Sequence, residues 1–125
     1  MNWLVVAMLG LVAQDPGQWQ DFGADANGAR VSLNVDSIET AEQGPEAMVR
    51  VRFARPAADG AVQIDYRSVF DCSARTVARF QMGELAADGE IVARTDEGMR
   101  VAPVPAAAGT PLGEVLDLVC SMAGD

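Results

Sequence analysis

The side chains able to do chemistry in this sequence are eighteen carboxylates, nine arginines and two cysteines. Histidine and lysine are both absent, so no serine has a neighbouring base to activate it, and the commonest metal ligand is missing. Two cysteines 48 positions apart cannot supply the four thiolates of a structural zinc site. These absences predict a protein that is not an enzyme and that needs no metal or other cofactor.

Four of the arginines fall on the polar side of alternating segments in the middle of the chain. Arg50 and Arg52 alternate with valines, and Arg67 and Arg79 hold similar positions in the two segments that follow. If these segments are neighbouring strands, the four guanidinium groups share one face of a sheet. That face is either a solvated surface with cross-strand ion pairs or a patch that grips an acidic or carboxylate-bearing partner.

The overall charge limits the kind of partner. The formal net charge is −9, and binding of a nucleic-acid backbone depends on clustered cations. We therefore expect no nucleic-acid partner. A protein of the cell envelope or of a host matrix is the expected partner, if there is one.

The elements that must position these residues follow from the alternation of apolar and polar residues. The clearest strands are predicted in three runs, and weaker strands are expected at about Trp19 to Phe22, Ala29 to Val35 and Glu90 to Arg94. The first clear run places Val49, Val51 and Phe53 on one side. The second places Val62, Ile64, Tyr66, Phe70 and Cys72 opposite Gln63, Asp65, Arg67 and Asp71. The third places Ala78, Phe80 and Met82 opposite Val77, Arg79 and Gln81.

The other elements are indicated by turn residues and by a change in the spacing of apolar residues along the chain. The dipeptides Asn27-Gly28, Asp59-Gly60 and Asp88-Gly89 predict hairpins or loops. Residues 101–109, rich in proline and alanine, predict an extended linker. Beyond this linker, Leu112, Val115, Leu116, Val119 and Cys120 recur at helical spacing, with Thr110 as the cap and Pro111 in the first turn.

The two cysteines lie on the apolar sides of their predicted elements. Cys72 falls on the core side of a strand, and Cys120 falls on the helical stripe that must dock on the sheet. This placement predicts a disulfide, which would stabilise the fold by roughly 4 kcal/mol on the chain-entropy model. The alternative is two free buried cysteines in a cytosolic protein.

The N-terminal segment resembles an export signal. Residues Trp3 to Ala13 form an uncharged apolar run with the length of a leader's hydrophobic region, well short of the roughly 20 residues that span a bilayer. We expect residues 1–13 to be a signal peptide, residues 18–125 to be one domain, and no transmembrane span. The alternative is that this run is a buried strand or helix of the domain itself. Export favours a disulfide because the compartment is oxidising.

Several segments resemble the surface-adhesin protein E family of exported bacterial proteins. They are FDCSARTVARF, ADGEIV and GTPLGEVLDLVC, together with VDSI at Val35 to Ile38. The resemblance implies a small antiparallel sheet with an added C-terminal helix, a leader or lipoprotein anchor, and paired cysteines at positions 72 and 120. It also raises binding to host matrix or serum proteins as a function.

Together these patterns predict an α+β domain: a small antiparallel sheet of about six strands with one C-terminal helix packed on it. The expected function is surface recognition of another protein, in the periplasm or at the cell surface. The alternative is an envelope-maintenance or structural protein with no external ligand. A small-molecule carrier would need a pocket, and few aromatic residues are available to line one. A homodimer could form through an uncovered edge strand.

Overall fold

The computed structural model of the chain describes residues 18–95 and 103–123. Within these ranges it contains eight strands, one short 3-10 helix and one α-helix. The first elements are β2 (Trp19–Ala24), β3 (Arg30–Asn34), η2 (Val35–Ser37), β4 (Glu39–Ala41) and β5 (Gly44–Arg52). They are followed by β6 (Ala61–Asp71), β7 (Thr76–Ala86), β8 (Ile91–Thr95), β9 (Val104–Pro105) and α1 (Pro111–Met122).

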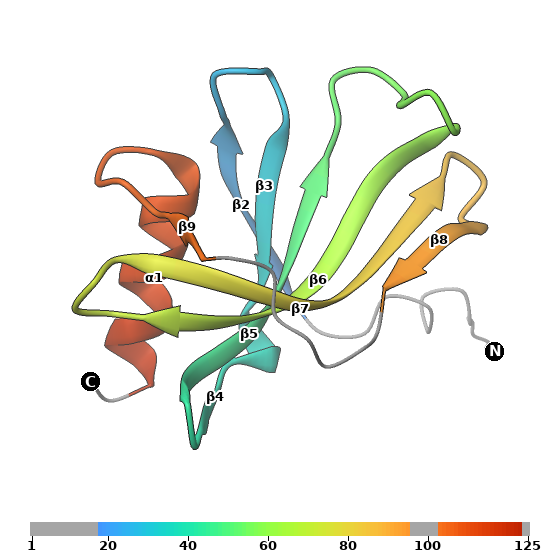
Figure 1. The fold of residues 1–125 in the computed structure, drawn as a ribbon. Helices are drawn as coiled ribbons and strands as arrows, with labels where there is room; N and C mark the ends of the chain where they lie inside the picture. Colours follow the sequence, from blue (N-terminus) through green and yellow to red (C-terminus); the bar gives the residue numbers. More distant parts are fainter. Residues whose placement is uncertain (1–17, 96–102, 124–125) are drawn as a thin grey trace, which may run out of the picture.

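All the strands belong to one antiparallel sheet. Its main order is β2-β3-β5-β6-β7-β8, with β4 added beside β5 and β9 added beside β7. The sheet is strongly twisted, and α1 lies against one of its faces (Figure 1). The predicted α+β class, a sheet with one C-terminal helix packed on it, is confirmed. The six predicted strands form the main order, and the two short added strands were not predicted.

The face of the sheet beneath α1, which we call the inner face, carries the hydrophobic core. Strand residues at alternate positions are fully or almost fully buried there, and α1 adds three apolar side chains to the same cluster. The largest members are Leu33, Val49, Phe70, Val77, Val115, Leu116 and Val119. We call the opposite side, which holds Ser32, Arg50 and Asp65, the outer face.

The start of α1 explains how the helix docks so closely. The Thr110 hydroxyl accepts a hydrogen bond from the Gly113 N–H at 3.1 Å, and Pro111 occupies the first turn, as predicted. Gly113 is buried, and a Cβ at this position would overlap the carbonyl oxygen of Ala107. Only glycine therefore allows the preceding loop to cross the helix at this point.

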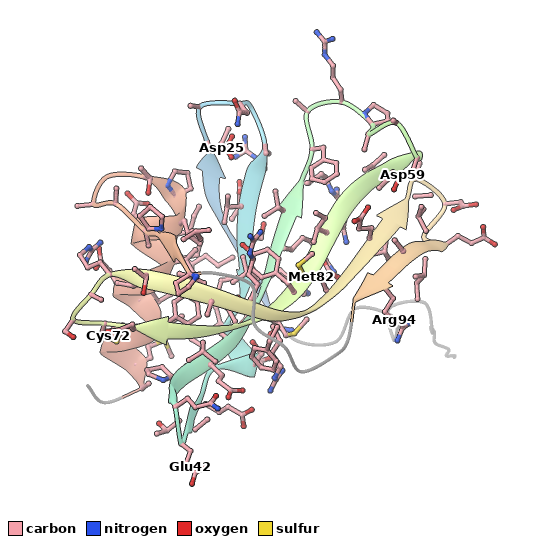
Figure 2. All side chains as sticks on the ribbon, in the orientation of Figure 1. Asp25, Glu42, Asp59, Cys72, Met82 and Arg94 are labelled. Carbon is pink, nitrogen blue, oxygen red and sulfur yellow. A yellow bond between two sulfur atoms is a disulfide. The ribbon has the colours of Figure 1, made fainter. Side chains whose placement is uncertain are left out.

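Three hairpin loops at one end of the sheet have the same backbone geometry. In each loop, the backbone N–H of the first residue donates a hydrogen bond to the carbonyl oxygen of the residue four positions later. The carbonyl oxygen of the same first residue accepts a hydrogen bond from the N–H of the glycine three positions later. The glycines are Gly28, Gly60 and Gly89, with φ values of 83°, 90° and 89°. This is a type I turn followed by a glycine bulge, which needs a positive φ. Figure 2 labels Asp25 and Asp59 in two of these loops. The three predicted turn dipeptides are therefore confirmed as hairpin loops.

The prediction for the third strand is wrong about which face is buried. Val77 is fully buried opposite Phe70, although it was expected on the polar side. The register of β6 against β7 shifts at Phe80, because Ser68 faces Arg79 and Arg67 faces Gln81. Phe80 is an extra residue in β7, so the alternation reverses there. If strict alternation is assumed from Met82 and Phe80 toward the start of the strand, without this bulge, the first half of the strand is assigned to the wrong face.

Other departures are small. The linker expected at 101–109 contributes β9, whose two residues pair with Thr76 and Val77, and Ala106 beyond it is fully buried. Residues 101 and 102 lie outside the described residues. The predicted leader at 1–13 also lies outside them.

Candidate functional site

The two cysteines form a disulfide that joins the sheet to the helix. Cys72 lies in the turn after β6, Cys120 lies in α1, and their Cα atoms are 6.0 Å apart. Figure 2 shows Cys72 at the tip of the β6–β7 hairpin, beside α1. Arg75 in the same turn forms an ion pair with Asp117 of α1 at 2.8 Å, and its carbonyl accepts from the Ala106 N–H. The predicted cross-link is confirmed, and its surroundings indicate a structural role.

The structure brings three of the four predicted arginines together. Arg50 and Arg52 of β5 and Arg67 of β6 lie on the outer face, where Arg50 is in register with Asp65. Arg79 is separated from them because the bulge at Phe80 turns it to the inner face. Its guanidinium carbon lies 5.5 Å from the centre of the Tyr66 ring. Burial raises the pKa of Tyr66 to about 12 despite this nearby cation.

Arg50 is held firmly at the centre of the outer face. Its Nε and Nη2 atoms donate to the two carboxylate oxygens of Asp65 at 2.9 and 3.1 Å. The Trp19 ring of β2 covers the guanidinium group at 3.9 Å. The two charged side chains are only 16% and 21% exposed. A bidentate ion pair beneath an aromatic ring is a rigid arrangement, so Arg50 is a fixed point on this surface.

Arg67 has its charge compensated twice. Its Nη2 lies 2.6 Å from Glu39 of β4, and its Nε lies 3.4 Å from Glu46 of β5. The short strand β4 therefore supplies one of the two carboxylates. Of the two interpretations offered by the sequence, a surface of cross-strand ion pairs describes Arg67 well.

Arg52 is different, because its partner is uncharged. Its Nη2 donates to the Gln63 side-chain oxygen at 2.7 Å, and the Gln63 amide donates in turn to Asp65 at 3.1 Å. Across the ranges that the structure describes, no carboxylate lies within ion-pairing distance of Arg52. Among those residues, the direct partner of Arg52 is the neutral Gln63 amide, which does not compensate its charge.

Sequence reasoning missed Arg30, which belongs to the same group. Arg30 on β3 stands directly opposite Arg52 on β5, and its Nη2 contacts Asp21 at 2.5 Å. The hydrogen bond from Arg30, together with the Gly23 N–H, holds the pKa of Asp21 below its usual range. Arg30 lies in one of the weaker predicted strands, and only the register between β3 and β5 places it beside Arg52.

These side chains line a hollow in the outer face, which we call the arginine hollow. Its volume is about 250 Å³, and its wall consists of Asp21, Arg30, Ser32, Arg50 and Arg52. Three cations and one anion therefore meet in one concave site of a chain whose net charge is −9. Clustered guanidinium groups with a hydroxyl beside them are suited to binding an anion.

Two further observations concern metals and membranes. Among residues 18–95 and 103–123, no group of three or more acidic or cysteine side chains is placed to hold a metal ion. No helix in those ranges combines the length and apolar character that crossing a bilayer requires.

No family model, curated protein or solved structure matches this chain. The resemblance to the surface-adhesin protein E family therefore stays a prediction.

Proposed function

We propose that this chain is an exported recognition protein that binds another protein through the outer face of its sheet. The observation that carries the proposal is the arginine hollow. Arg30, Arg50 and Arg52 converge there, although the chain as a whole is strongly acidic. The helix packs on the opposite face of the sheet, so α1 does not cover this hollow.

The edges of the sheet are less suited to recognition than its face. The outermost strands β2 and β8 each contain an extra residue relative to their neighbours, between Asp21 and Ala24 and at Val92. Bulges in edge strands twist the backbone away from a regular ladder and discourage another strand from pairing. This feature favours binding through side chains on the outer face over dimerisation through an edge.

Export to the periplasm or cell surface is the second part of the proposal. A disulfide between sheet and helix is typical of proteins that mature in an oxidising compartment. The apolar run from Trp3 to Ala13 has the length of a leader. Sequencing the mature N-terminus after bacterial expression tests this part. An intact Met1 in the cytoplasmic fraction would contradict it.

The recognition itself is tested by capture from envelope extract and from host matrix, using the full oxidised chain as bait. The informative comparison is between Arg52→Gln, in the hollow, and Arg67→Gln, on the same face but outside its wall. We expect a captured protein to be lost with the first variant and kept with the second. A protein captured equally by both variants, or no capture by the wild-type chain, would count against the proposal.

A further inference from the structure

We propose that the arginine hollow binds a carboxylate group, with Arg52 and Arg30 as its charged ligands and the Ser32 hydroxyl as an additional donor. The proposal rests on the recognition function above and names the chemistry that the partner must present. That chemistry is an aspartate or glutamate side chain of an exposed segment of the partner protein.

The first argument is the pairing of like charges. Arg30 and Arg52 face each other in register on neighbouring strands, where opposed side chains have their Cβ atoms roughly 5 Å apart. Like charges in such positions destabilise a sheet unless an anion compensates them. Asp21 compensates Arg30, whereas Arg52 has only the neutral Gln63 amide. Among the described residues, Arg52 therefore lacks the ionic partner that Arg30 has.

The second argument is the contrast with the other arginines of the same face. Arg67 contacts two glutamates, and Arg50 is paired side-on with Asp65. The sheet thus provides carboxylates for Arg30, Arg50 and Arg67 but, among the described residues, none for Arg52. An external carboxylate would supply the missing ionic partner at Arg52.

The third argument concerns the size and charge of the ligand. A hollow of about 250 Å³ admits a carboxylate with the first carbons of its side chain. Guanidinium groups match the planar oxygens of a carboxylate through paired hydrogen bonds. Asp21 in the wall and Asp65 behind Arg50 repel a more highly charged ligand. A singly charged carboxylate is therefore favoured over phosphate.

The test uses small probes, because one carboxylate site is expected to bind only in the millimolar range. The full chain is titrated with acetyl-Gly-Glu-Gly-amide, with the matched glutamine tripeptide, and with inorganic phosphate. Binding is followed by NMR through the side-chain Nε–H resonances of the arginines. We expect the glutamate tripeptide to shift the Arg30 and Arg52 signals saturably, the glutamine tripeptide to leave them unchanged, and phosphate to bind more weakly.

Variants then locate the site. Loss of a charge-assisted hydrogen bond predicts that Arg52→Gln weakens binding of the glutamate tripeptide about tenfold or more. Arg67→Gln is expected to leave the affinity unchanged. The backbone spectrum of each variant is the check that the fold is retained. Equal shifts with the glutamate and glutamine tripeptides, unchanged affinity of Arg52→Gln, or tighter binding of phosphate would overturn the proposal.

Failure of the carboxylate site can be distinguished from failure of the proposed recognition function. If the glutamate tripeptide binds as expected but the capture experiment yields no protein, the carboxylate site stands and protein recognition falls. If a captured protein is lost with Arg52→Gln but the glutamate tripeptide does not bind the wild-type chain, recognition through the hollow stands and the carboxylate site falls.

Discussion

The inner and outer faces of this sheet are built from the same strands but differ in what holds them together. On the inner face, Leu33, Val49 and Phe70 are almost completely buried beneath α1, and the disulfide fixes the helix in place. On the outer face, the contacts are ion pairs and hydrogen bonds between half-exposed side chains. Burial of apolar area contributes far more to stability than exposed ion pairs do. The stability of the domain therefore lies on the inner face, which leaves the outer face free for recognition.

Removing the disulfide, which holds α1 on the inner face, is expected to lower the free energy of unfolding more than any other change proposed below. In the Cys72→Ser, Cys120→Ser double variant, the closed loop of 48 residue steps is opened, and the chain-entropy model predicts a loss of about 4 kcal/mol in the free energy of unfolding. Urea unfolding followed by circular dichroism measures the loss, with the reduced wild-type chain as the matched control. A midpoint unchanged from that of the oxidised protein would show that the inner face does not depend on the cross-link.

Truncation of a core side chain is expected to have the next largest effect. Leu116 of α1 is 1% exposed, so Leu116→Ala should cost about 3 kcal/mol through lost transfer energy and a residual cavity. Ile91 of β8 is 53% exposed, and Ile91→Ala is the matched control, with an expected cost below about 1 kcal/mol. Equal losses for the two variants would contradict the assignment of the core.

The buried Tyr66 makes the stability of the domain depend on pH in the alkaline range. Burial raises its pKa from 10.0 to about 12, so the neutral form is the one that the folded state favours. The corresponding stability is fully present below pH 10 and is lost as the pH rises toward 12, by on the order of 2–3 kcal/mol. The chain has one tyrosine, so a rise in absorbance at the phenolate band reports ionisation of this group. Tyr66→Phe should remove the loss of stability between pH 10 and 12. A phenolate transition near pH 10 in the folded protein would disprove the burial effect.

The two faces were not equally predictable from the sequence. Period-two alternation identified the outer-face positions of Arg50, Arg52 and Arg67, because β5 and β6 pair without a bulge along these positions. Helical spacing likewise identified the apolar stripe of α1, and together these patterns predicted the disulfide. Alternation is a local property, and it fails wherever the ladder between two strands is interrupted.

The errors arose at such interruptions and in pairings distant along the chain. The extra residue Phe80 leaves no mark in the sequence, and it moves Arg79 to the opposite face from Arg67. Arg30 joins the arginine hollow only through the register of β3 on β5, which a single segment cannot reveal. The short strands β4 and β9 exist because longer neighbours offer them a free edge, so they have no pattern of their own.

The smallest expected effect concerns the ion pairs of the outer face, and it separates a shielded pair from an exposed one. Arg50 and Asp65 are 16% and 21% exposed, whereas Arg30 and Asp21 are 55% and 49% exposed. A double-mutant cycle with Arg50→Gln and Asp65→Asn should give a coupling energy of about 1 kcal/mol, because the bidentate pair is shielded by Trp19. The same cycle on Arg30 and Asp21 should give a smaller coupling energy, since water and salt screen that exposed pair. Both couplings are measured by urea unfolding at low and high salt. Equal couplings at the two pairs would show that Trp19 does not shield the centre of the outer face, and Arg50 would then no longer be a fixed point beside the arginine hollow.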